Sequence, residues 1–158
     1  MFDFLKKDKN EVVSPITGTC IDMVKVPDKV FSSKVLGDGF AVIPTGNVVV
    51  APVDGEIVMI PESKHAFGMK TRSGAEVLVH IGLDTVELNG EGFTLKAECG
   101  NKVKAGTPLI TFDSEFMAGR RINMITMVIF TDGYEKEIQL DCYDSTVSAG
   151  QVLFSMDS

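Results

Sequence analysis

Short runs of apolar residues recur along the chain, and turn-forming residues separate them. The runs are rich in β-branched and aromatic side chains, and Gly, Pro, Asp or Asn bounds most of them, which is typical of β-strands. No long stretch keeps the 3.6-residue period of an amphipathic helix. The pattern therefore predicts strands at residues 48–50, 56–60, 76–81, 108–112 and 127–130.

Helical signals are short and few. The best candidate is Asp113–Arg121, where Asp113 or Ser114 could cap the first turn. A second helical turn is expected near Pro27–Phe31. The pattern thus favours a β-structure that contains only short helical turns.

Two motifs each occur twice. The run VVSPITG at residues 12–18 returns as VVAPVDG at 49–55, and VKAGTPL at 103–109 returns as VSAGQVL at 147–153. Pro and Gly recur at fixed offsets, so the repeats indicate a repeated turn geometry and not a repeated chemistry. Chance similarity between strand–turn sequences is the alternative. We predict an all-β, antiparallel sandwich or barrel of Greek-key or jelly-roll type with internal pseudo-duplication.

The 158 residues are enough for one domain, and no linker or low-complexity run divides them. We expect a flexible N-terminal lead over residues 1–12 and a single domain over residues 13–158. No apolar run approaches the ~18 residues of a membrane span, and the first ten residues lack the apolar stretch of a signal peptide. A start at Met1 with a short polar lead favours a free subunit.

The formal net charge of −7 disfavours nucleic acid and anionic membrane as main partners and favours a basic protein partner. The cysteines Cys20, Cys99 and Cys142 form no CxxC pair, which argues against a structural zinc site or a disulfide framework. Reduced thiols fit a cytoplasmic protein, so we expect that location.

The chain has two histidines, His65 and His80. Residues 71–75 read as a turn, and folding the chain about Ser73-Gly74 places His65 opposite Gly82 and Phe67 opposite His80. His80 and Gly82 share one face of their strand, so the two imidazoles would be diagonal neighbours. A slip of one residue in this register would put them on opposite faces.

A lone histidine in a strand is more often structural than catalytic, but a neighbouring pair suggests shared chemistry. A neutral imidazole offers a nitrogen nucleophile that can accept a phosphoryl group and pass it on. The sequence has no GxxxxGK[ST] loop and no HRD or DFG set to bind a donor nucleotide. Such a group would therefore come from one protein and leave to another.

Two other classes of function remain open at this point. The segment from His80 to Asp84 fits an HxxxD zinc-hydrolase pattern, but the chain has no third histidine to complete a catalytic site. His65 and His80 could still share zinc with a carboxylate of a partner. A biotinyl or lipoyl carrier is suggested by the repeated hairpins, although Met69-Lys70-Thr71 is a poor copy of the usual lysine motif.

The segment LVHIGLDTVELNGEGF at residues 78–93 is similar, almost position by position, to the active-site signature of the glucose-type enzyme IIA of the bacterial sugar phosphotransferase system. Further similarity lies at residues 37–41, 44–46, 51–57 and 64–68. The resemblance covers nearly the whole chain, and the long signature is highly specific.

The resemblance implies an antiparallel β-sandwich in which His80 is phosphorylated. His80 would receive the group from the phosphocarrier protein HPr and deliver it to a cysteine of the IIB domain of a sugar permease. His65 would hydrogen-bond the phosphoryl group. Ser63 stands where the family usually has threonine, and its hydroxyl would orient the His65 ring.

The resemblance also implies a docking surface. It combines the acidic positions Asp28 and Asp84 with the apolar positions Val30, Phe31, Phe67 and Val86. We add Glu87, close to Asp84 in the sequence, as a further partner-binding residue. Alternatively, the acidic residues of this surface are ordinary solvated surface residues and its phenylalanines are ordinary core residues. No cofactor would be required, and zinc would bind only at a partner interface. The protein would visit the inner face of the membrane transiently through the permease. Regulatory targets such as glycerol kinase or other permeases stay unassigned, as does the sugar.

Overall fold

The computed structural model describes residues 9–157 of the chain. Its backbone is built mainly from short strands, in agreement with the apolar pattern. In chain order the strands are β1 (Glu11–Val13), β2 (Gly18–Asp22), β3 (Asp38–Pro44), β4 (Val48–Val50), β5 (Gly55–Met59), β6 (Ala66–Lys70), β7 (Glu76–Ile81), β8 (Phe93–Leu95), β9 (Lys102–Val103), β10 (Pro108–Phe112), β11 (Thr126–Asp132), β12 (Thr146–Val147) and β13 (Val152–Ser155).

The structure contains four helical segments over the described residues, and all four are short, as expected. They are the 3-10 turns η2 (Met23–Lys25) and η3 (Thr85–Leu88) and the helices α1 (Lys29–Ser32) and α2 (Ser114–Gly119). Asp28 accepts the Val30 N–H at the start of α1, and Asp113 accepts the Phe116 N–H at the start of α2. Both predicted helical turns are thus confirmed, and the cap of α2 is Asp113.

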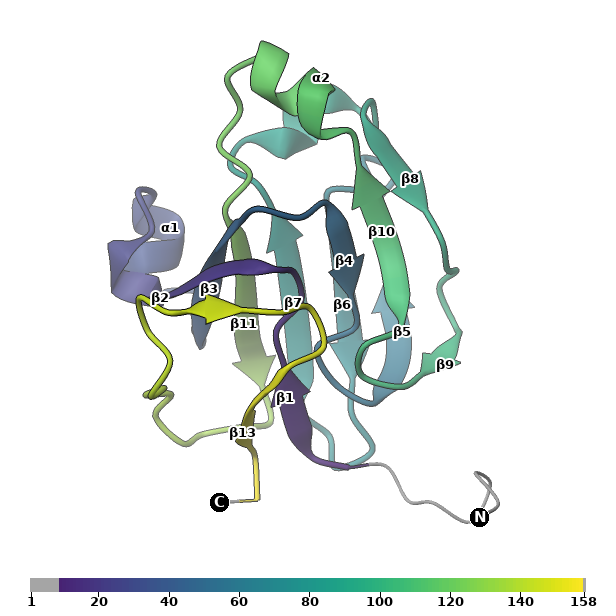
Figure 1. Cartoon of the computed structure of the whole chain (residues 1–158). Helices are drawn as coiled ribbons and strands as arrows, with labels where there is room; N and C mark the ends of the chain where they lie inside the picture. The colour runs from purple at the N-terminus through teal and green to yellow at the C-terminus, as the bar shows by residue number, and fades with distance from the viewer. Residues whose placement is uncertain (1–8, 158) are drawn as a thin grey trace.

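Two layers of antiparallel sheet face each other (Figure 1). One is an eight-stranded sheet in the order β12-β2-β3-β11-β7-β6-β5-β9, and the other is formed by β4-β10-β8 together with the pair β1-β13. The predicted sandwich is therefore right, whereas the alternative of a barrel is wrong. Over the described residues the eight-stranded sheet keeps two open edges, at β12 and β9.

The sequence repeats correspond to a structural duplication. β1 pairs with β13 as β4 pairs with β10, and β2 pairs with β12 as β5 pairs with β9. The two copies also bind each other reciprocally at their centres. The Val13 N–H donates to the Pro52 carbonyl, and the Val50 N–H donates to the Pro15 carbonyl. The predicted pseudo-duplication is confirmed, and the repeated Pro marks the crossing point.

Two groups of buried side chains lie on opposite faces of the eight-stranded sheet. The larger fills the sandwich and includes Phe40, Phe67 and Met69. The smaller lies on the outer face, where η2 and α1 cover part of the sheet, and it includes Phe31 and Met127. Apolar burial of this kind contributes roughly 25 cal/mol per Å², so the outer cluster fixes α1 against the sheet.

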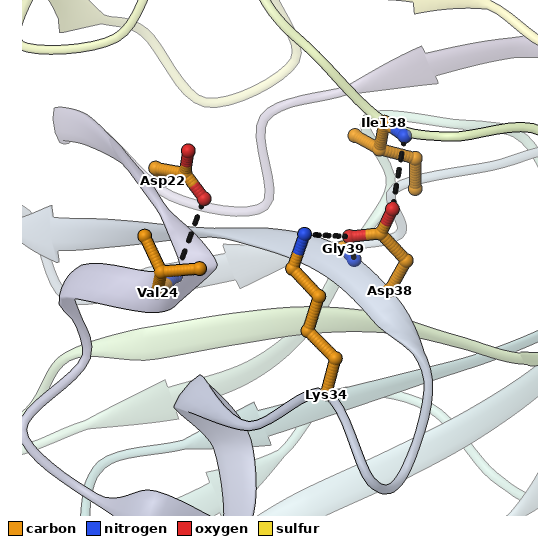
Figure 2. A network of polar contacts seen from close by, with 6 residues as sticks. All are labelled: Asp22, Val24, Lys34, Asp38, Gly39 and Ile138. Carbon is orange, nitrogen blue, oxygen red and sulfur yellow. Dashed lines mark hydrogen bonds and ion pairs between the residues drawn. The ribbon is translucent and has the colours of Figure 1, made fainter.

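Polar contacts secure the segment that carries α1 (Figure 2). The Asp22 carboxylate accepts the Val24 N–H at 3.2 Å and so caps η2. The Asp38 carboxylate accepts the Ile138 N–H at 3.0 Å and pairs with Lys34 at 3.1 Å. These bonds tie both ends of the α1 segment to β2 and β3, which matters because α1 lies beside the histidine pair.

A flexible N-terminal lead is predicted over residues 1–12. Residues 1–8 of it lie outside the described residues. Within the described part, the Lys9 N–H donates to Asp54, and Glu11 and Val12 belong to β1, opposite Ser155 and Phe154. Lys9, Glu11 and Val12, which belong to the predicted lead, thus contact the rest of the domain.

Candidate functional site

His80 occupies the outer face of the eight-stranded sheet at the carboxyl end of β7. Val77, Val79 and Ile81 point into the sandwich and are buried, so the alternate residues Leu78 and His80 face outward. His80 is half-buried there. The strand alternation therefore presents an imidazole at a surface that α1 partly covers.

The hairpin register differs by one residue from the predicted one. Ala66 lies opposite His80, and Phe67 lies opposite Val79. The turn is centred on a single residue, since Lys70 pairs with Glu76 and the Thr71 N–H donates to the Ala75 carbonyl. The expected turn centre between Ser73 and Gly74 is therefore wrong, because the turn is centred on Ser73.

The two histidines meet despite this difference. His65 precedes the first residue of β6, and Lys64 before it has a left-handed φ of 57°. Because His65 lies outside β6, the alternation of side chains between the two faces of that strand does not determine where its ring points. The His65 and His80 ring centroids lie 4.9 Å apart with the planes at 79°, an edge-to-face contact.

The prediction that Phe67 belongs to the docking surface is wrong. The register places it on the inner face of β6, where it is fully buried in the sandwich core. Phe31 is also mostly buried, at 8% exposure, and its ring packs 4.9 Å from the His80 ring. Phe31 therefore supports the imidazole and offers little surface to a partner.

A backbone carbonyl fixes the tautomer of His80. The distance from His80 Nδ1 to the Gly82 oxygen is 2.9 Å. A carbonyl only accepts, so Nδ1–H is the donor, and the neutral ring then keeps its lone pair on Nε2. Nε2 is therefore the ring atom that has a lone pair available to a reaction partner.

Gly82 is needed for that bond. Its φ is 80°, and a Cβ at this position would come within 2.6 Å of Thr85 Cγ2. Its own N–H donates to the Ile125 carbonyl at 2.9 Å, which anchors the turn. No residue type marks this carbonyl in the sequence, and the glycine two residues after the histidine indicates only the turn that positions it.

Ser63 contacts the second histidine. Its Oγ lies 2.6 Å from His65 Nδ1, so the predicted orienting residue and the ring are in hydrogen-bond contact. His65 is itself 8% exposed, and burial lowers its pKa. The ring is thus held in one orientation, with Nε2 as its other polar atom.

His80 is neutral at physiological pH. Burial is the main cause that lowers its pKa to about 4, and the neighbouring His65 adds to the effect. The hydrogen bond to Gly82 and the carboxylates of Asp28 and Asp84 oppose it. A neutral imidazole of low basicity keeps Nε2 free of a proton over the whole physiological range.

We predict that the ¹⁵N signals of the His80 ring stay those of a neutral Nδ1–H tautomer from pH 8 down to pH 5.5, and that protonation begins only as the pH approaches 4. Long-range ¹H–¹⁵N NMR measures this directly. The folded pKa lies below the ordinary 6.5, so the stabilisation from neutral His80 is present above pH 6.5 and is lost as the pH falls towards 4. A midpoint near 6.5 for His80 would contradict the assignment.

Carboxylates and aliphatic side chains surround the histidines. Asp28 and Asp84 both act electrostatically on His80, and Asp84 caps η3 in a left-handed conformation (φ 59°) without using its carboxylate in a cap bond. Val30 and Val86 are 51% and 52% exposed. Glu87 is exposed on η3 as well. The predicted acidic and apolar positions are thus at the surface, with two exceptions: Phe67 is fully buried and Phe31 is mostly buried.

No three histidine, cysteine or carboxylate side chains gather in a metal-binding arrangement within residues 9–157. Zinc at a partner interface stays a prediction. Over the same residues, no helix is long and apolar enough to cross a membrane.

Residues 10–136 match the profile of the family described as phosphoenolpyruvate-dependent sugar phosphotransferase system, EIIA 1. The chain belongs to this family. The resemblance seen in residues 78–93 is thereby confirmed, and the chain is a sugar phosphotransferase system component from a family of phosphotransferases.

Relatives and a solved structure agree. The chain is 44% identical over 127 residues to the glucose-specific EIIA component of Bacillus cereus, which covers 80% of this chain and 77% of that protein. It is 46% identical over 136 residues to the glucosamine-specific EIICBA component of Bacillus subtilis, covering 85% of this chain. It spans only 22% of that multi-component protein. The fold matches glucose permease IIA from Mycoplasma capricolum with a TM-score of 0.82, 39% identity and 97% coverage of each chain.

Proposed function

We propose that this family member is a phosphocarrier that accepts a phosphoryl group from phospho-HPr on Nε2 of His80 and passes it to a cysteine of a IIB domain, for sugar uptake and phosphorylation. The observation that carries the proposal is the bond from His80 Nδ1–H to the Gly82 carbonyl. It leaves the lone pair of a neutral ring on Nε2, and this ring lies edge-to-face against His65.

Acceptance requires only the His80 lone pair. Nε2 attacks the phosphorus, the bond from phosphorus to the donor breaks, and a new N–P bond forms. The ring becomes cationic as the bond forms, and the Gly82 carbonyl accepts a stronger hydrogen bond from Nδ1–H. The carboxylates of Asp28 and Asp84 lie close enough to stabilise the same charge.

Delivery reverses these steps. The cysteine sulfur of the IIB domain attacks phosphorus, the N–P bond breaks and the electron pair returns to Nε2. The transferring group spreads its charge over three equatorial oxygens. We assign His65 Nε2–H as the donor to one of these oxygens, since a Ser63 hydroxyl that donates to Nδ1 leaves the ring proton on Nε2.

Relatives support the IIB partner. The multi-component relatives carry EIIA together with B and C components in one protein, as in the glucosamine-specific EIICBA component of Bacillus subtilis. A IIA segment in those proteins is permanently tethered near its acceptor. HPr as the donor rests on the family resemblance and on the acidic rim around His80, which suits a basic partner.

The test is reconstitution with phosphoenolpyruvate, enzyme I and HPr. We expect an acid-labile, alkali-stable phosphoryl group and an intact-mass increase of about 80 Da on the protein. The same mass measurement separates the other classes of function, because a lipoyl or biotinyl group is heavier and a zinc hydrolase carries no adduct. The absence of any adduct after full phosphorylation of HPr would reject the proposal.

Reversing the charge of Asp84 should slow acceptance from HPr. We expect Asp84→Lys to lower the transfer rate roughly three- to tenfold at low salt, with a smaller difference at high salt, because charge complementarity acts mainly on association. Rapid-quench measurements at several ionic strengths give the rates.

Two variants control for other effects of that substitution. Asp84→Asn keeps a residue type that tolerates the left-handed φ of 59° and removes only the charge, so it should lie between wild type and Asp84→Lys. Glu98→Lys changes an exposed acid in the loop before β9 and should leave the rate unchanged. Equal slowing by Glu98→Lys would show that only net charge matters.

A further inference from the structure

Basic side chains gather around a cavity of about 520 Å³ at the far end of the sheet from the histidine pair. Lys70, Arg72, Lys102 and Lys104 line it, together with the single carboxylate of Glu56. The chain as a whole carries a net charge of −7, so this concentration of positive charge is local. We call these four side chains the basic pocket.

Strand register builds the basic pocket from three separate segments. Glu56 on β5 lies opposite both Lys70 on β6 and Lys102 on β9, so the three side chains share the outer face. Arg72 follows in the turn after β6, and Lys104 follows β9. The segments converge at the β9 edge of the sheet (Figure 1).

The basic pocket is separate from the histidine site. His80 lies opposite Ala66 at the start of β6, whereas Lys70 ends that strand. Four residue steps along a strand amount to roughly 13 Å. The pocket residues take no part in the phosphoryl chemistry described above, and they need a separate explanation.

Most of the positive charge in the basic pocket is not neutralised. Over residues 9–157, Lys70, Arg72 and Lys102 form no ion pair. Lys104 pairs with Asp54 at 3.6 Å, and that carboxylate also accepts the Ala105 N–H. A single carboxylate, Glu56, lies among the three unpaired cations, so an anion in the cavity would meet a net positive field.

Size and chemistry indicate the kind of anion. Cavities of ~300–1,000 Å³ hold small molecules. Arg pairs with phosphate through two parallel hydrogen bonds, and Lys binds it as a point charge. The exposed side chain of Val58 lines the same cavity and supplies apolar contact for a carbon skeleton. An extended polyanion would be repelled by the acidic remainder of the surface.

We propose that the basic pocket binds a small organic phosphate monoester, with Arg72 and Lys102 contacting the phosphate group. The ligand binds away from His80, so the pocket is a second site and not part of the transfer reaction.

The test is an NMR titration of the full chain, with ¹⁵N-labelled protein and two probes, inorganic phosphate and glucose 6-phosphate, at constant ionic strength set with chloride. We expect saturable shifts of the amides at residues 55–58, 70–72 and 102–104, with tighter binding of glucose 6-phosphate than of inorganic phosphate. Arg72→Gln and Lys102→Gln should each weaken binding at least fivefold. Lys96→Gln, which removes one positive charge outside the pocket, should change it less than twofold.

Each other outcome overturns the proposal. Shifts that do not saturate, or that respond equally to Lys96→Gln and Lys102→Gln, would indicate screening of surface charge. Tighter binding of inorganic phosphate would exclude the organic group from the site. Binding of vesicles containing anionic lipid or of an acidic peptide, without binding of glucose 6-phosphate, would assign the pocket to a macromolecule instead. The readout uses no phosphoryl transfer, so it does not depend on the proposed function.

Discussion

Phosphorylation by phospho-HPr is expected to be abolished by His80→Ala, with a loss of at least ~10³-fold in rate. The substitution removes the Nε2 lone pair. Among the described residues of the site, His80 is the imidazole that a backbone carbonyl holds in the tautomer with this lone pair on Nε2. Rapid-quench labelling and intact mass measure the effect.

The fold should persist in this variant. His80 is half-buried on the outer face, and the sandwich core that holds β7 in place is made by Val77, Val79 and Ile81. Circular dichroism and thermal unfolding check this. Glu76→Ala changes a residue on the same face at the other end of β7 and serves as the matched control, with normal labelling expected. Full labelling of His80→Ala would assign the phosphoryl group to another residue.

Replacing His65 with glutamine should separate the two half-reactions. We expect His65→Gln to accept the phosphoryl group from HPr at nearly the normal rate, and to pass it to the IIB domain at least ~10-fold more slowly, a barrier increase of about 1.4 kcal/mol or more. The reason is that His80 Nε2 needs only its lone pair to attack, whereas the departing group needs a positioned donor for its equatorial oxygens. Single-turnover measurement of each half-reaction gives the two rates.

Changes at Ser63 provide the control for that asymmetry. Ser63→Ala removes the contact to His65 Nδ1 and should slow delivery in the same direction but less, since the ring remains. Ser63→Thr keeps the hydroxyl and should deliver at close to the normal rate. Equal slowing of acceptance and delivery in His65→Gln would show that His65 shapes the site without acting as the donor.

The sequence predicted most of the architecture because its signals are local. Apolar runs bounded by turn residues located β4, β5, β7, β10 and β11, and Asp113 identified the start of α2 through its cap. The repeated Pro and Gly offsets predicted the duplication, since the same turn recurs wherever the same dihedral restrictions recur. The two histidines were expected to be neighbours, and they are.

What the sequence did not predict depends on tertiary geometry. One residue in the β6–β7 register changes which face Phe67 occupies, and the turn at residues 71–75 gave no cue to its centre. The partner of His80 is a main-chain oxygen of Gly82, which every residue has and no composition reveals. The basic pocket joins Lys70 to Lys102 across three strands, so no sequence window contains it.

The pairing of β1 with β13 has a consequence for how such a domain is joined to others. Glu11 lies opposite Ser155, and the Met156 N–H donates to the Asn10 carbonyl, so the incoming and outgoing strands are hydrogen-bonded neighbours. Both lie at the opposite end of the molecule from α2, whereas β7 runs towards α2 (Figure 1). His80 is the last residue but one of β7. A tether attached through either strand therefore starts from one common edge and leaves the end that carries His80 uncovered. The same unit can precede or follow its neighbours in a fused protein without rebuilding its reactive face.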